Sequence, residues 1–290
     1  MSKEIRIGGP VFSKFKDPQS FVKDLQDLGF SATYDPMIKD DILLKETIHA
    51  LKEADILIAE TGAYGINVLE PKQDQRKSNI REICNLLERA EKLGSLCCVA
   101  HGGWVGSSRF NQHNPENFSE SSVGKLISSV QEIIDTVQPE KTKFVLETES
   151  RYLPDSTEIY RYILSSVNRS AFGAHLDPVN ITSSPRRFYQ SGDFIRKCFS
   201  EIGSYLVSCH AKDIQMPRYV QVKFDESFAG NGGLDYNSYF SELAKLETDV
   251  PMMIEHVNSK QLVWAIDYLY GQAEIAGVNV KYGEKRIRVL

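Results

Sequence analysis

Short apolar runs alternate with longer amphipathic segments along most of the chain. Runs rich in apolar and β-branched residues predict buried strands, and they lie at 5–9, 31–35, 56–60, 96–101, 144–148, 173–177, 205–210 and 252–256. Between them, apolar residues recur every three or four positions, which predicts helices. Phe21, Leu25 and Leu28 share one such face, and Gly29 follows as a C-cap. Eight strands that alternate with helices predict an α/β fold of the (β/α)8 TIM barrel type.

An open, doubly wound sheet would show the same alternation of strands and helices. Such sheets commonly carry a G-x-G-x-x-G sequence after the first strand, or a G-x-x-x-x-G-K-[ST] loop, and the chain has neither. The segment GNGG (230–233) is rich in glycine, but it does not follow a strand directly and offers no lysine for a phosphate. We therefore expect one barrel domain over residues 1–290, with a strand-like C-terminal tail (about 278–290) that could pack on a neighbouring molecule.

Composition narrows the class of protein. The chain has 290 residues, of which 41% are hydrophobic and 25% charged, as in an ordinary globular protein. The net charge of −5 and the lack of a Lys/Arg run argue against a nucleic-acid partner. The chain shows no signal peptide and no stretch of 18 apolar residues, so we expect a cytoplasmic protein without a membrane partner. Its five cysteines include no C-x-x-C pair and are expected in a reduced core.

A polar residue closes each of the last four predicted strands. These residues are Glu147, Asp177, His210 and Glu255. One such residue alone would more commonly start a polar loop, but the strand ends of a barrel converge on one face. Without a cation, carboxylates brought together there would repel one another. Three carboxylates and one imidazole therefore predict a single divalent metal ion, with Mn²⁺ favoured and Mg²⁺, Co²⁺ or Zn²⁺ also compatible.

Five short motifs carry a resemblance to a known family. They are LETE (146–149), HLDP (175–178), CHAKD (209–213), GNGGLDY (230–236) and MIEH (253–256). With them the chain resembles the xylose isomerase-like TIM barrel superfamily, which includes sugar phosphate isomerase/epimerases, ketose 3-epimerases, inosose and dehydroshikimate dehydratases and endonuclease IV. The resemblance implies that Glu147, Asp177, His210 and Glu255 hold one divalent metal.

One position departs from the family pattern. The family commonly has a histidine three residues after the aspartate, and this chain has Asn180 there. The residue at this position usually contacts substrate, so Asn180 is a candidate substrate-binding residue. The missing histidine argues against a multinuclear zinc site, and therefore against a DNA-repair nuclease of the endonuclease IV type.

The resemblance also implies the chemistry of the site. Glu147 and Glu255 would face opposite sides of a small sugar or polyol derivative, one removing a proton next to a carbonyl and the other returning it. The metal would polarise the carbonyl and stabilise the enediolate. This describes a metal-dependent isomerase or epimerase of carbohydrate metabolism, with Glu147 and Glu255 as catalytic residues.

Other activities remain open on the same fold. A lyase would expel hydroxide, as in an inosose or dehydroshikimate dehydratase. The catalytic subunit of a C-glycoside-cleaving enzyme would in addition need a small partner subunit. A non-catalytic sugar-binding barrel would not need two metal-bound glutamates. We also expect that barrel helices could pair two copies in a homo-oligomer.

Several further residues are candidates for contact with substrate. Lys212 could orient a substrate oxygen, and Glu149 could support the metal ligands from outside, although either could instead be a solvated residue. His101 and Trp104 follow the fourth predicted strand and could line the sugar, with Trp104 alternatively in the core.

Two further histidines lie beside the predicted metal ligands. We expect His175 to be a core histidine, deeper in the barrel than Asp177. Strand alternation predicts that His256 points away from the metal.

The loops after the first four strands should determine the substrate. They span residues 8–14, 35–39, 60–71 and 101–110.

Overall fold

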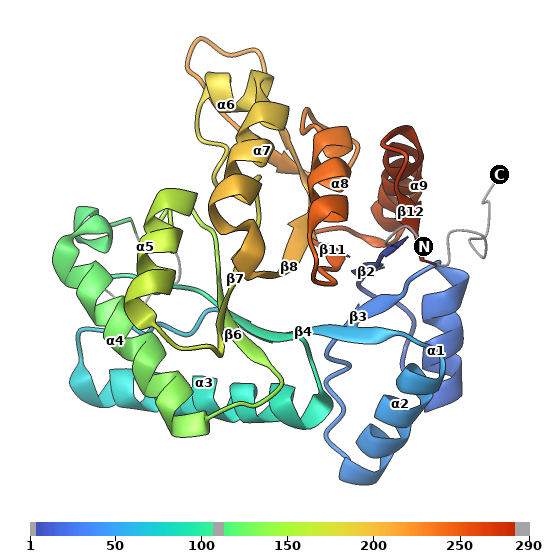
Figure 1. Cartoon of the computed structure of the whole chain (residues 1–290), viewed down its shortest axis with the longest axis horizontal. Coiled ribbons are helices and arrows are strands. Elements are labelled where there is room, and N and C mark those ends of the chain that lie inside the picture. Colours follow the sequence, from blue (N-terminus) through green and yellow to red (C-terminus); the bar gives the residue numbers. More distant parts are fainter. Residues whose placement is uncertain (1–3, 107–112, 282–290) are drawn as a thin grey trace. The chain divides into compact units, whose positions relative to one another are not determined.

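A computed structural model of the chain describes residues 4–106 and 113–281. Eight strands form a closed parallel barrel in the order β11-β2-β3-β4-β5-β6-β7-β8, which confirms the predicted fold. Their bounds are β2 Ile7–Gly9, β3 Ala32–Tyr34, β4 Leu57–Ala63, β5 Cys97–Ala100, β6 Lys143–Glu147, β7 Phe172–Leu176, β8 Leu206–Ala211 and β11 Met252–Ile254. Strands and helices alternate along the chain (Figure 1).

Helices follow the barrel strands along the chain, as the alternation of the two patterns predicts. They are α1 Pro18–Asp27, α2 Asp41–Glu53, α3 Gln73–Leu93, α4 Glu120–Val137, α5 Thr157–Val167, α6 Pro185–Tyr189, α7 Ser191–Ile202, α8 Tyr236–Lys245 and α9 Ser259–Ile275, with short 3₁₀ turns at Pro115–Phe118 and Gly203–Tyr205. Helices α3, α4 and α5 pack one against the next along the outside of β5–β7 (Figure 1). Their buried faces cover that part of the barrel.

Local sequence explains several helix ends. Asp17 and Asn258 each form a capping box, which satisfies backbone N–H groups at the start of α1 and α9. Gly29 has φ 77°, a left-handed conformation that glycine adopts without steric cost, and it directly follows the C-cap of α1. The predicted end of this helix is therefore confirmed.

Two short pairs of strands lie outside the closed barrel, and the β9–β10 hairpin among them was not predicted. Strand β1 (Glu4–Ile5) pairs in parallel with β12 (Asn279–Val280), so the start of the expected C-terminal tail lies against the chain's own first strand. An antiparallel hairpin of β9 (Asp213–Gln215) and β10 (Asp225–Ser227) follows β8. Both hairpin strands have three residues, too few for an alternating pattern to be read from sequence. The rest of the tail, 282–290, and residues 107–110 of the predicted substrate loop lie outside the described residues.

The chain groups into two compact units. The first contains the chain up to Ala59, then Thr182–Ser200, and the chain from Cys209 onward; the second contains Glu60–Ile181 and Glu201–Ser208. In the first unit, Ala32, Ala59 and Met253 form a buried cluster inside the barrel. In the second, Cys97, Val99 and Val145 do the same. Small and branched side chains fill the interior as they do in other barrels of this type.

Two further sequence expectations can be compared with the structure. All five cysteines are buried and free of disulfides, as expected for core residues. Across residues 4–106 and 113–281, every helix is too short or too polar to cross a bilayer.

Candidate metal and catalytic centre

Glu147 and Asp177 stand at the C-terminal ends of neighbouring strands in the second unit. Glu147 is the last residue of β6, and Asp177 directly follows β7; both are buried. The Oδ1 atom of Asp177 accepts hydrogen bonds from the backbone N–H groups of Val179 (2.9 Å) and Asn180 (3.2 Å). The Thr148 hydroxyl lies between the two strands, donating to the Asp177 carbonyl (2.9 Å) and accepting from its N–H (2.8 Å). The Asp177 carboxylate is therefore held in one orientation.

Asn180 and His101 contact the carboxylate of Glu147. The Asn180 amide donates from Nδ2 to Oε1 (3.1 Å), and His101 Nε2 lies 3.5 Å from Oε2. His101 Nδ1 accepts a hydrogen bond from the backbone N–H of Gly65 (3.3 Å), so a neutral His101 carries its proton on Nε2, toward Glu147. The structure thus brings together His101, Asn180 and Glu147, which the sequence predicted to belong to one site.

His210 and Glu255 form the corresponding group in the first unit. His210 belongs to β8 and is buried, and Glu255 directly follows β11. The two strands pair in parallel with Met253 opposite His210, and His210 Nδ1 lies 3.2 Å from Glu255 Oε1. Tyr239 from α8 donates its hydroxyl to the His210 carbonyl (3.2 Å), which supports this strand end from behind.

Lys212 lies beside Glu255 rather than in solvent. Its side chain is 2% exposed, and Nζ is 2.7 Å from Glu255 Oε1 and 3.0 Å from Glu226 Oε2. Glu226 comes from strand β10 and also contacts His256 Nδ1 (2.7 Å). Burial alone would raise the pKa of Glu226, but the hydrogen bond from His256 and the charge of Lys212 hold it below its usual value. The hairpin is thus joined to the end of β11 by charged side chains.

Two other predicted residues are buried. Glu149 is 5% exposed and accepts hydrogen bonds from Arg151, at the backbone N–H (3.3 Å) and at Nε (3.0 Å); the solvated alternative for Glu149 is therefore wrong. Trp104 is 1% exposed and packs near Tyr152, with ring centroids 6.0 Å apart. The structure therefore places this indole in the core, the alternative that the sequence analysis had left open.

The prediction that His256 points away from the metal assumed that the strand extends to this residue, and that assumption is wrong. Strand β11 ends at Ile254, and His256 has φ 51°, so the alternation of a strand does not extend to it. Its Nδ1 contacts Glu226, and its Nε2 lies 3.7 Å from Glu255 Oε2. The side chain therefore turns back toward the glutamate that precedes it.

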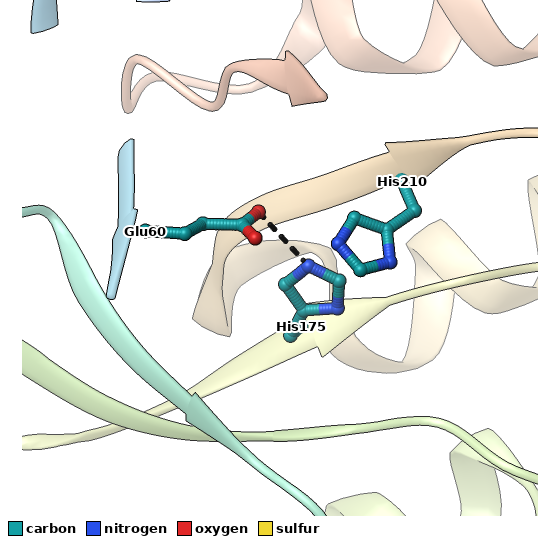
Figure 2. Close-up of side chains that lie close together, drawn as sticks. All are labelled: Glu60, His175 and His210. Atoms are coloured by element: carbon teal, nitrogen blue, oxygen red, sulfur yellow. Dashed lines mark hydrogen bonds and ion pairs between the residues drawn. The ribbon is translucent and has the colours of Figure 1, made fainter. Parts of the chain in front are cut away.

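A buried polar network in the second unit was not predicted from the sequence. Glu60 Oε1 accepts a hydrogen bond from the Ser208 hydroxyl (2.5 Å) and lies 3.1 Å from His175 Nε2, as Figure 2 shows for the histidine. All three side chains are fully buried, which confirms His175 as a core histidine. Glu60 ends the predicted strand 56–60, whereas β4 continues to Ala63, so Glu60 lies inside its strand and Glu147 at the end of its own.

The donor chemistry of the predicted ligands fits a divalent cation. Glu147, Asp177 and Glu255 offer carboxylate oxygens and His210 offers an imidazole nitrogen. Such a mixture suits Mn²⁺, Mg²⁺, Co²⁺ or Zn²⁺. Burial of these acids without a counter-charge would be costly, and a cation would remove that cost.

Solved structures with the same fold cover nearly the whole chain. A xylose isomerase domain protein from Planctomyces limnophilus is 18% identical with a TM-score of 0.69, covering 96% of this chain and 99% of that one. A D-psicose 3-epimerase from Clostridium cellulolyticum H10, solved with D-tagatose, is 16% identical with a TM-score of 0.69 and coverage of 94% and 99%. A xylose isomerase-like protein from Mycobacterium smegmatis, solved with magnesium, is 13% identical with a TM-score of 0.65 and coverage of 94% and 96%. At these identities the likeness shows the fold.

Family membership rests on the sequence match. Among curated proteins, none matched the chain. The family model described as xylose isomerase-like TIM barrel matches residues 21–273, a range that begins within α1 and ends within α9. The predicted resemblance is confirmed, and the chain belongs to the xylose isomerase-like TIM barrel family.

Proposed function

We propose that the protein is a divalent-metal-dependent isomerase or epimerase that moves a proton next to the carbonyl of a small sugar or polyol derivative. One observation carries this proposal. Two glutamates at barrel strand ends, Glu147 and Glu255, each face a histidine, at 3.5 Å for His101 and 3.2 Å for His210. Carboxylates held beside proton-bearing partners are suited to removing and returning a proton.

The proposed metal ligands are Glu147, Asp177, His210 and Glu255. Each lies at the C-terminal end of a parallel barrel strand or directly after it, and in barrels of this type those ends converge on the active site. The cation, when bound, would polarise the substrate carbonyl and stabilise the enediolate. Mn²⁺ is the metal that we propose first, and a related barrel was solved with magnesium.

The chain's own residues have separate tasks in this reaction. Glu147 and Glu255 exchange the carbon-bound proton. Asn180 fixes the Oε1 atom of Glu147, and His101 presents its Nε2 proton beside Oε2. Lys212, which is buried and lies 2.7 Å from Glu255 Oε1, orients that carboxylate.

Proton NMR in D₂O tests the proposal. The Mn²⁺-loaded protein is incubated with a panel of ketoses, aldoses and inososes, and entry of deuterium at a carbon-bound position is followed. We expect exchange at one carbon, slowed by about 10²–10⁴-fold in Glu147→Gln and Glu255→Gln. Glu46→Gln, a substitution on the exposed side of α2, should exchange like the wild type.

Two results would contradict the proposal. Tight metal binding with no exchange on any member of the panel would remove the isomerase and epimerase assignments. Loss of a hydroxyl group from the sugar together with exchange would instead identify a dehydratase on the same site.

A further inference from the structure

A cavity lies in the second unit, beside the loop that follows β4. Its volume is about 580 Å³, within the range of small-molecule sites. Its walls are this loop, the first turns of α3 and the segment after β5, with Tyr64, Glu70, Gln75 and Trp104 among the lining residues. None of the proposed metal ligands is among its lining residues.

Glu70 makes this cavity unusual. The side chain is only 6% exposed, yet it lines the cavity. Within residues 4–106 and 113–281, its carboxylate accepts one hydrogen bond, a long one from the backbone N–H of Lys72 to Oε1 (3.3 Å). A buried carboxylate normally accepts several hydrogen bonds or pairs with a cation. Glu70 therefore retains most of its hydrogen-bonding capacity for an occupant of the cavity.

The wall around Glu70 is already rigid. Asn67 Oδ1 accepts from the backbone N–H groups of Leu69 (3.0 Å) and Trp104 (2.9 Å), and its Nδ2 donates to the Trp104 carbonyl (2.8 Å). Asn79 from α3 donates to the Asn67 carbonyl (2.7 Å). These bonds join the two loops to the helix before any ligand arrives, so little ordering is needed on binding.

The lining indicates an uncharged, hydroxyl-rich ligand. The acids Glu70 and Glu82 face the same cavity as Lys72, and this mixture of signs favours neither a strong cation nor an anion. A carboxylate can accept hydrogen bonds from two neighbouring hydroxyl groups, and the side-chain amide of Gln75 adds a further polar group. Tyr64 is 41% exposed and offers an aromatic ring as an apolar surface. We propose that this cavity binds a polyhydroxylated group of the carbohydrate type, with Glu70 accepting hydrogen bonds from its hydroxyls.

The cavity is connected to the residues around Glu147. Gly65, which lines it, donates its N–H to His101, and the rings of Tyr64 and His101 lie 5.2 Å apart. The occupant is therefore either the distal part of a larger substrate or a separate free sugar. Binding of a sugar in this cavity does not depend on the proposed function. The interpretation of that sugar as the distal part of a larger substrate does rest on it.

Saturation-transfer NMR on the chelator-treated protein tests binding without metal chemistry. The probes are maltose, D-glucose and, as a cationic comparison, argininamide. We expect transfer to at least one of the two sugars and an affinity about ten-fold or more lower in Glu70→Gln, because hydrogen bonds to a charged acceptor are lost. Glu88→Gln, which changes an exposed acid of α3 outside the lining of the cavity, should stay within about two-fold of the wild type. Thermal unfolding of both variants verifies that they are folded.

Each outcome decides the assignment. Saturation transfer to argininamide but not to the sugars would overturn the assignment of a carbohydrate site. Sugar binding that Glu70→Gln leaves unchanged would also overturn it.

If a sugar binds, the D₂O exchange assay distinguishes the distal part of a larger substrate from a separate free sugar. A Glu70→Gln variant that raises KM for a disaccharide substrate but not for its monosaccharide identifies a distal subsite. Unchanged KM values for both, with sugar binding lost, identify a separate ligand. Failure of exchange with every sugar would remove the proposed function while leaving the binding result intact.

Discussion

Tyr160 stabilises two strands through a single hydroxyl group. This fully buried residue of α5 donates to the carbonyl of Leu146 on β6 (2.5 Å) and accepts from the backbone N–H of His175 on β7 (3.2 Å). Burial raises the pKa of Tyr160 above its usual value, so the hydroxyl stays neutral and able to donate. We expect Tyr160→Phe to lower the free energy of unfolding by about 1–3 kcal/mol, because buried backbone groups lose their partner. Urea denaturation measures this change.

The same helix offers a matched control for this residue. Tyr162 is 57% exposed, and Tyr162→Phe should change the free energy of unfolding by less than about 0.5 kcal/mol. Equal effects of the two substitutions would show that the bridging hydroxyl contributes nothing particular to the strands that carry Glu147 and Asp177.

At the scale of an element, the loop between β10 and α8 depends on the absence of a side chain at Gly232. Asp213 accepts hydrogen bonds from the N–H groups of Gly230 (3.1 Å) and Leu234 (2.9 Å), which draws the loop against β9. A Cβ at Gly232 would lie 2.2 Å from Asp213 Oδ1 and 2.4 Å from the Ile214 carbonyl. We expect Gly232→Ala to lower the free energy of unfolding by about 1–3 kcal/mol, measured by denaturant titration.

A second glycine gives the opposite expectation. Gly271 lies inside α9 and has open space where a Cβ would be. Gly271→Ala should therefore raise the free energy of unfolding by about 0.5–1 kcal/mol, since alanine restricts the unfolded chain and favours helix. A destabilised Gly271→Ala variant would contradict this description of α9.

At the scale of the whole molecule, Arg6 links segments that are far apart in the sequence. This buried guanidinium donates to Asp249 Oδ2 (2.9 Å), Asp55 Oδ1 (2.8 Å) and the Asp55 carbonyl (2.7 Å), and Lys281 also pairs with Asp55. The hydrogen bond from Lys281, followed by that from Arg6, holds the pKa of Asp55 below its usual value. The group therefore joins the first strand, the end of α2 and the segments before β11 and after β12.

This cluster predicts an acid-dependent loss of stability. Because the folded pKa of Asp55 is lowered, its contribution is full above the unfolded value of about 3.9 and is lost as the pH falls through the folded pKa. We expect Asp55→Asn to cost about 1 kcal/mol at pH 7, since the carboxylate is 54% exposed and solvent screens it. Asparagine tolerates the positive φ of 54° at this position.

Urea denaturation of both proteins between pH 7 and pH 2 measures this effect. The difference between Asp55→Asn and the wild type should shrink as the pH falls below the unfolded pKa of about 3.9 and through the lowered folded pKa of Asp55. A difference that stays constant over this range would assign the effect to something other than ionisation of Asp55.

Much of the fold could be predicted because its signals are local. The barrel, the faces of its helices and the C-cap at Gly29 follow from the spacing of apolar residues and from one glycine. The same rule placed Glu147 and Asp177 at strand ends, but it ends the strand of Glu60 too early, because β4 continues to Ala63. His256 shows where it fails, because β11 ends two residues earlier than the apolar run predicts.

The sequence by itself determined the order of strands and helices and the polar residues at the strand ends, since periodicity and residue type act over a few positions. Tertiary structure decided which side chains meet. Glu60 and Ser208 are 148 residues apart in the chain, and Lys212 meets Glu226 only because an unpredicted hairpin folds back beside β11. Such partners depend on how the strands pack together, and no local pattern of apolar and polar residues records that packing.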